Sequence, residues 1–290
     1  EILIGLVGSE MCIRDRCMYD FSRDMFAGTG IGEVNTIIRS LHKPGVWVNL
    51  SQTPHVMRLT QRNMKVRVEE DINIGGVTGL VEDKDGNLWI SKWTDINVKR
   101  PDKDDLVVSG SDVPVMTSLF NDVKGEVLGL SHESKIYRLS CADGRITCEL
   151  KDSISSLLEK EEVNSVCIDR KGRLWLNTTL GRILRSDETM HKFENVSLDN
   201  EIDDCTVLGL LSDKNSVWII TNKKVLQYNI DSQTFQHYST ADDNIMVDVF
   251  RYKAISLDGW GGLYVGGHRG FIHIRPGNAS AVNWAPTSLH

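Results

Sequence analysis

The stretches VTGLVEDKDGNLWISKW (residues 77–93) and VNSVCIDRKGRLWLNTT (residues 163–179) follow one pattern. Each begins with a short run of β-forming residues, passes through Asp-x-x-Gly-x-Leu-Trp, and continues into a second apolar run. Asp and Gly favour tight turns because they tolerate the positive φ angles that such turns need. The pattern therefore predicts two antiparallel strands joined by a turn, with a large side chain early in the second strand.

The pattern recurs along the chain, with a large residue at the equivalent place in each copy. DVKGEVLGL and DGWGGLYVGG keep its spacing, whereas HKPGVWVNL and DKNSVWIIT have a turn that is one residue shorter. Successive copies lie about 39 to 47 residues apart, a period that is typical of β-propeller blades. The six repeat anchors are Trp47, Trp89, Leu128, Trp175, Trp218 and Tyr264. We expect each anchor to fill the gap between neighbouring sheets, because a single small sheet cannot bury both of its faces.

The fold class predicted from this repeat is all-β, a β-propeller over residues 17–277 with about six repeats of a truncated seven-bladed ring. Such a ring would be open or strained and would expose a sheet edge, with sequence upstream of Cys17 completing the first blade. FQHYS (residues 235–239) is expected to be an outer strand. SISSLLEKEEV (residues 153–163) is the helix candidate, but we interpret it as a loop insertion or a distorted outer strand.

Residues 1–16, EILIGLVGSEMCIRDR, read as a translated sequencing adapter. Reverse translation of Val7–Asp15 matches the transposon-derived adapter of common sequencing libraries, and the preceding residues fit its upstream part. A secretory signal fits poorly, because no basic region precedes the short apolar run. We therefore exclude residues 1–16 from reasoning about the fold.

The final repeat carries a resemblance to a known family. DDNIMVDVFRYKAISLDGWGGLYVGGHRGFIHIRP has a Phe-containing start, a Gly-x-Leu-aromatic strand, then Gly-Gly-x-x-Gly-Phe and a Pro. Together with Asp-x-x-Gly-x-Leu-Trp-Ile, this resembles the two-component regulator propeller of Bacteroidetes-type hybrid two-component histidine kinases. The sequence departs from the family pattern at Leu128, at the shortened turns before Trp47 and Trp218, and at Ser91-Lys92.

The resemblance implies a periplasmic sensor domain cut at both ends. In that family the ligand is an oligosaccharide, and residues 278–290 would begin the linker to a missing immunoglobulin-like domain. The histidine kinase, the membrane helix and a homodimeric arrangement would belong to the parent protein. The net charge of −7 argues against nucleic acid as a partner, because nucleic-acid binding favours a basic face.

No catalytic constellation, metal site or cofactor motif is apparent in the sequence. The histidines are scattered, and the glycine-rich FAGTGIG (residues 26–32) lacks the Gly-Lys-Ser/Thr of a phosphate loop, so a connecting turn is favoured. SCADGRITC brackets an expected hairpin turn at Asp143-Gly144. A two-residue turn would place Cys141 opposite Ile146 and Cys148 opposite Leu139, so a disulfide between them would need a longer loop.

Ligand candidates are aromatic side chains outside the anchors, together with polar groups beside them. Trp260 lies within a turn, and His268 and Arg269 lie in the next connection. Trp93 is the fourth candidate, although family resemblance favours a packing role for it. The arginines found about ten residues beyond the anchors could ring a channel, but we expect them to be solvated or ion-paired; they are Arg58, Arg100, Arg138, Arg185 and Arg275.

Three functions compete at this stage. A non-catalytic sensor propeller agrees with the resemblance in the final repeat. A secreted propeller lyase or hydrolase would need His and acidic residues gathered at one mouth of the ring, and the spacing does not favour this. A protein-interaction scaffold has the same fold requirements as a sensor. We therefore favour the sensor.

Overall fold

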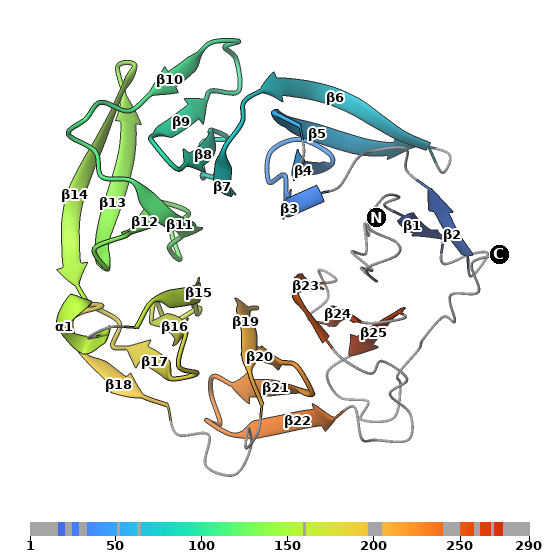
Figure 1. The fold of residues 1–290 in the computed structure, drawn as a ribbon, viewed down its shortest axis with the longest axis vertical. Coiled ribbons are helices and arrows are strands. Elements are labelled where there is room, and N and C mark those ends of the chain that lie inside the picture. The colour runs from blue at the N-terminus through green and yellow to red at the C-terminus, as the bar shows by residue number, and fades with distance from the viewer. Residues whose placement is uncertain are drawn as a thin grey trace.

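The computed structural model is a ring of antiparallel sheets, which Figure 1 shows along its shortest axis. It describes residues 17–20, 25–28, 34–50, 53–62, 65–158, 161–196, 205–239, 250–257, 262–267 and 270–274. Within these residues the fold is all-β apart from one short helix, α1 (Ser155–Leu158). The predicted fold class, an all-β propeller, is confirmed.

Five sheets have four strands each, and chain order is also spatial order within each sheet. The first contains β3 (Val34–Arg39), β4 (Val46–Leu50), β5 (His55–Arg62) and β6 (Lys65–Asn73). The second contains β7 (Val77–Glu82), β8 (Leu88–Lys92), β9 (Ile96–Lys99) and β10 (Leu106–Val108). The third contains β11 (Met116–Asn121), β12 (Val127–Ser131), β13 (Lys135–Ala142) and β14 (Arg145–Ser153).

The fourth sheet contains β15 (Val163–Ile168), β16 (Leu174–Thr178), β17 (Ile183–Ser186) and β18 (Phe193–Asn195). The fifth contains β19 (Val207–Ser212), β20 (Ser216–Thr221), β21 (Lys224–Asn229) and β22 (Phe235–Ser239), so the expected outer strand at 235–239 is confirmed. A three-stranded sheet follows, with β23 (Phe250–Leu257), β24 (Leu263–Gly267) and β25 (Gly270–Ile274). The two-stranded sheet of β1 (Cys17–Asp20) and β2 (Met25–Gly28) lies in the remaining arc, between β6 and β25 (Figure 1).

The aspartate of the repeat organises the turn between the first and second strands. In the second sheet one oxygen of Asp83 accepts the backbone N–H groups of Asp85 and Asn87, both at 2.9 Å. Gly86, at φ +83°, supplies the left-handed residue that closes the turn. Asp122, Asp169 and Asp213 each accept two backbone N–H groups of their own turns in the same way.

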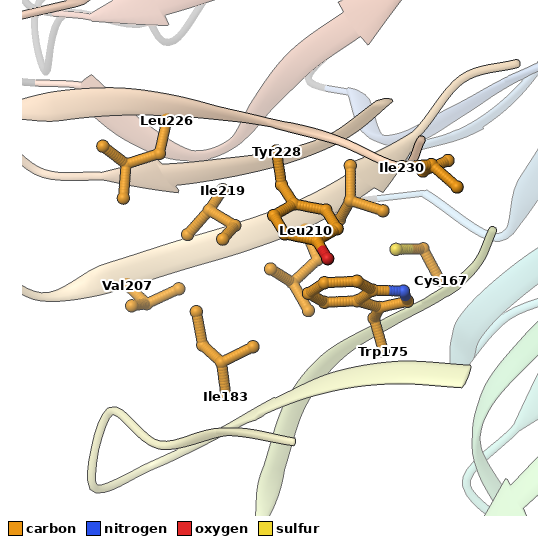
Figure 2. Close-up of a cluster of buried hydrophobic side chains, with 10 residues drawn as sticks. Cys167, Trp175, Ile183, Val207, Leu210, Ile219, Leu226, Tyr228 and Ile230 are labelled. Carbon is orange, nitrogen blue, oxygen red and sulfur yellow. The ribbon is translucent and has the colours of Figure 1, made fainter. Parts of the chain in front are cut away.

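Each anchor lies in the second strand of its sheet and is buried, as the repeat predicts. Figure 2 shows the packing at the junction of the fourth and fifth sheets, where Trp175 is fully buried beside Tyr228 with their ring centroids 5.0 Å apart. The surrounding side chains are aliphatic and come from both sheets, among them Ile183, Leu210 and Leu226. The anchors therefore stabilise the ring by filling the space between sheets.

Two local expectations meet different outcomes. The helix candidate at 153–163 forms α1, a single helical turn inserted between β14 and β15 in place of a distorted outer strand, and its Leu158 is buried against the junction of the third and fourth sheets. The hairpin between β13 and β14 is confirmed: Asp143 and Gly144 have φ angles of 50° and 74°. Cys141 pairs with Ile146 and Cys148 with Leu139, and both thiols are free.

Candidate functional site

The ring has two faces, which differ in the connections they carry. The Asp turns between first and second strands lie on one face, which we call the Asp-turn face. The connections between second and third strands lie on the other face, beside the segments that lead into the first strands. Backbone hydrogen bonds link these two kinds of segment, from Trp93 to Gly76, from Thr179 to Glu162 and from Asn222 to Thr206. We call this second face the Trp93 face.

A β-bulge recurs in the first strand of every four-stranded sheet, close to the Trp93 face. The register of the first and second strands shifts by one residue at Val34/Thr36, Val77/Gly79, Met116/Ser118, Val163/Ser165 and Val207/Gly209. Two bulged residues turn their hydroxyls toward the second strand, Thr78 to Ser91 at 2.9 Å and Thr117 to the carbonyl of Leu130 at 3.0 Å. Bulges of this kind redirect side chains and are frequent next to functional sites.

Trp93 is a surface side chain. Its relative exposure of 68% contradicts the packing role that family resemblance favours, since a packed anchor such as Trp89 is only 2% exposed. It lies in the connection between β8 and β9, one residue beyond the end of β8. Trp93 is therefore the one predicted ligand candidate that the described residues place directly at the surface.

The other three ligand candidates, Trp260, His268 and Arg269, lie outside the described residues. In chain order His268 and Arg269 fall between β24 and β25, which is the type of connection that carries Trp93. Trp260 falls between β23 and β24, the type of connection that carries the Asp turns.

The connection that carries Trp93 is held by several hydrogen bonds. The backbone N–H of Lys92 donates to the carbonyl of Asp95 at 2.9 Å, and their side chains form an ion pair at 3.2 Å. Burial acts to raise the pKa of Asp95, but hydrogen bonds from Thr94, Lys92 and Asn97 outweigh it, and the pKa lies below its ordinary value. Asp95 is therefore an ionised acceptor at neutral pH, held in the connection that carries Trp93.

The arginines that follow the anchors are ion-paired, as expected, wherever the structure describes them. Arg58 pairs with Glu70 at 2.8 Å, Arg100 with Asp105 at 3.2 Å and Arg138 with Glu126 at 3.3 Å. Arg185 pairs with Glu194, donates to the hydroxyl of Tyr228 at 2.7 Å and lies 5.3 Å from the ring centre of Trp175. These side chains therefore link strands, sheets or, for Arg100, the two ends of one connection, and do not form a ring of free cations. Arg275 lies outside the described residues.

Within the described part of the chain, no three His, Cys, Asp or Glu side chains are arranged to hold a metal ion. Two histidines pair with aspartates, His55 with Asp71 at 2.8 Å and His191 with Asp152 at 3.0 Å, and these pairs lie in different parts of the ring. Among the same residues no helix has the length and hydropathy needed to cross a membrane.

Sequence reasoning missed two features of this site. The aspartate of the repeat accepts the anchor indole N–H, from Trp89 to Asp83, from Trp175 to Asp169 and from Trp218 to Asp213, at 2.8 to 2.9 Å. The near-constant Asp-to-Trp spacing could have revealed this pairing. The recurrent bulge has no such signal, because the bulged residues are of several types, namely Asn35, Thr78, Thr117, Asn164 and Leu208.

Comparison with known proteins agrees with this geometry. Residues 71–91 match the family described as two component regulator propeller, and this range includes the complete Asp83 turn and Trp89. No curated protein matches the chain in sequence.

Solved structures share the fold. The extracellular domain of the putative hybrid two component system BT3049 from B. thetaiotaomicron is 14% identical, with a TM-score of 0.62 over 90% of this chain and 37% of that one. The extracellular domain of the putative one component system BT4673 from the same organism is 13% identical, with a TM-score of 0.53 over 94% of this chain and 46% of that one. The chain thus spans less than half the length of either.

A lyase has the same architecture. A catalytically inactive variant of virginiamycin B lyase from Staphylococcus aureus, solved with Quinupristin, is 11% identical, with a TM-score of 0.61 over 86% of this chain and 83% of that one. At such identities the likeness shows the fold alone. Residues 71–91 match the two component regulator propeller family, and the Asp turn followed by a buried anchor that they contain recurs around the ring.

Proposed function

We propose that this chain is the non-catalytic sensor propeller of a hybrid two-component system. It detects an oligosaccharide outside the cytoplasm, in the periplasm, and passes the signal to a histidine kinase encoded beyond residue 290. The observation that carries the proposal is the matched regulator repeat, whose Asp turn and buried anchor recur in the neighbouring sheets. The extracellular domains of similar architecture support the location.

In this proposal residues 1–16 are an adapter artefact, residues 17–277 are the propeller and residues 278–290 begin the linker to an immunoglobulin-like domain. The parent protein is a homodimer anchored in the inner membrane, and its propeller binds no nucleic acid and needs no cofactor. A sensor of this kind needs a ligand-dependent change in how propellers or protomers contact each other, and no bond is made or broken in the ligand.

The experiment that tests the proposal is to recover the uninterrupted gene by reading past both ends of the fragment. A transmembrane helix and a kinase downstream, with further propeller repeats upstream, are the expected result. Purified parent protein should then change its autophosphorylation when oligosaccharides are added. A stop codon soon after His290 with no kinase would overturn the sensor function.

A lyase is the second candidate, favoured by the shared architecture of virginiamycin B lyase. Quinupristin is the direct probe, because that lyase was solved with it. The sensor proposal predicts that the chain leaves Quinupristin intact over hours at micromolar protein concentration, as followed by mass spectrometry. Turnover, abolished by substitution of a histidine of this chain, would establish the lyase.

A further inference from the structure

Trp93 is part of an exposed surface that includes residues from the connections of two sheets. Pro54, Gly75 and Gly76 are all exposed beside it. A methyl group placed on Gly75 would lie 3.2 Å from Cβ of Pro54, and one placed on Gly76 would lie 3.7 Å from Cδ1 of Trp93. The two glycines therefore lie between a proline and an indole, with Gly75 close against Pro54 and with no side chains of their own to cover the surface, and we call these four residues the Trp93 shelf.

The shelf is preorganised by its backbone. Gly76 has φ +72°, a conformation that glycine adopts without strain, and its carbonyl accepts the backbone N–H of Trp93 at 3.3 Å. On the other side, the carbonyl of Pro54 accepts the N–H of the buried Ile74 at 2.7 Å. A ligand that docks on the shelf would therefore lose little affinity to ordering of the protein backbone.

Two ion pairs involve residues that adjoin the shelf in the chain, His55 next to Pro54 and Lys92 next to Trp93. His55 and Asp71 form one pair, with 2.8 Å between Nδ1 and the carboxylate. Lys92 and Asp95 form the other, with 3.2 Å between Nζ and the carboxylate. All four side chains keep between 22% and 42% of their surface exposed, so they can still bond to a ligand. Lys92 is matched by Asp95, and His55, which is a cation only when protonated, is matched by Asp71, so these four side chains carry no net positive charge.

We propose that the Trp93 shelf is the contact site for a neutral oligosaccharide. This proposal rests on the sensor function proposed above and adds the site and the charge class of its ligand. The C–H face of a pyranose ring carries small positive charges that are attracted to the electron-rich face of an indole. Hydroxyl groups at the ring edge would donate to Asp71 and Asp95 and accept from Lys92.

An acidic glycan fits this site less well. Its carboxylate or sulfate groups would lie next to the carboxylates of Asp71 and Asp95, where like charges repel and where Lys92 is already neutralised by Asp95. A site built for an acidic sugar would offer arginine or lysine in excess of carboxylate. The charge balance of the two ion pairs therefore selects against uronic acids and sulfated sugars.

The test is calorimetric titration of the full chain with maltohexaose, cellohexaose, xylohexaose and mannohexaose, and with hexagalacturonate as the acidic comparator. At least one neutral hexasaccharide should bind, and Trp93→Ala should weaken it at least tenfold. Trp93→Tyr, which keeps an aromatic face, should stay within about threefold of the parent chain. Val123→Ala is the matched control, because Val123 is also exposed (57%) but lies on the Asp-turn face. Equal thermal unfolding of all variants would exclude a folding defect.

Several outcomes overturn the proposal. One is that the chain binds none of the neutral sugars, and another is that it binds hexagalacturonate more tightly than any of them. A third is that Trp93→Ala changes self-association and nothing else, which would make the shelf a contact between copies of the chain. Neutral-sugar binding that is insensitive to Trp93→Ala would overturn the site and leave the sensor function intact. Failure of the sensor function appears separately, as absence of a kinase in the uninterrupted gene.

Discussion

The indole N–H of Trp89 donates to the carboxylate of Asp83 at 2.8 Å, across the turn between β7 and β8. The same carboxylate accepts the two backbone N–H groups that shape the turn. Both side chains are buried, so neither can replace its partner with bulk water. One residue thus links the shape of the turn to the position of the anchor between the sheets, and the linkage recurs at Trp175 and Trp218.

The first sheet lacks this linkage and supplies an internal control. His42 stands where the other turns have aspartate and bonds to the carbonyl of Asp83, at 3.1 Å. Among the described residues, the buried indole nitrogen of Trp47 has no hydrogen-bond partner. Trp89→Phe and Trp47→Phe remove similar ring volume, but only Trp89→Phe removes a hydrogen bond to a buried carboxylate, whose Oδ2 keeps the side-chain N–H of Asn87. We expect Trp89→Phe to cost about 2 kcal/mol more in free energy of unfolding, because a lost bond to a charged group costs about 1.5–3 kcal/mol.

Denaturant unfolding of both variants measures this difference. Asp83→Ala should be more destabilising than either, because it also removes the two turn hydrogen bonds. The double variant Asp83→Ala/Trp89→Phe should cost less than the sum of the single changes, since the pair is lost only once. Additive costs would show that the indole hydrogen bond contributes nothing to stability.

Much of the fold was predictable because the repeat is carried by large residues at a regular period. Every anchor, including the divergent Leu128, is buried, since the gap between sheets must be filled whatever the sequence of the turn. The exposure of Trp93 was not predictable, because a tryptophan just after a strand looks the same whether it packs or projects. The ion pair of His55 and Asp71 joins neighbouring strands, and the pair of Lys92 and Asp95 lies at one connection. Which side chains pair there depends on strand register and loop shape, and these cannot be read from the residue types alone.

Tyr228 tests the contact between the fourth and fifth sheets. Its hydroxyl accepts a hydrogen bond from Arg185 at 2.7 Å, and its ring packs against Trp175. Tyr228→Phe keeps the ring and should cost about 1.5 kcal/mol, the lower end of the net value of a bond to a charged group, because Arg185 keeps its ion pair with Glu194. Trp175→Ala should cost about 3–5 kcal/mol, because it leaves a large cavity in the core. Thermal unfolding compares the two, and equal effects would contradict the packing role assigned to the anchor.

Glu70 gives the first sheet a dependence on pH. Burial acts to raise the pKa of Glu70, but hydrogen bonds and charge from Arg58 and Lys43 outweigh it, so the folded pKa lies below 4.5. The ionised carboxylate is thus favoured by folding, and its stabilisation is complete above the unfolded pKa and disappears as pH falls through the folded pKa. Glu70→Gln should lower the free energy of unfolding by roughly 1 kcal/mol at pH 7 and by less near pH 3. Glu149→Gln, in the more exposed pair with Lys151, is the control and should change little at either pH.

Cys167 tests the burial of the junction shown in Figure 2. Burial among Trp175, Leu210 and their neighbours raises the pKa of its thiol to about 12, so the reactive thiolate is scarce at pH 8. We expect the parent chain and Cys167→Ser to release the same amount of chromophore from Ellman's reagent when folded. In denaturant the parent chain should release one equivalent more. The difference between the two chains cancels the contribution of the other cysteines. If the folded parent chain already releases one equivalent of chromophore more than folded Cys167→Ser, the junction between the fourth and fifth sheets opens to solvent.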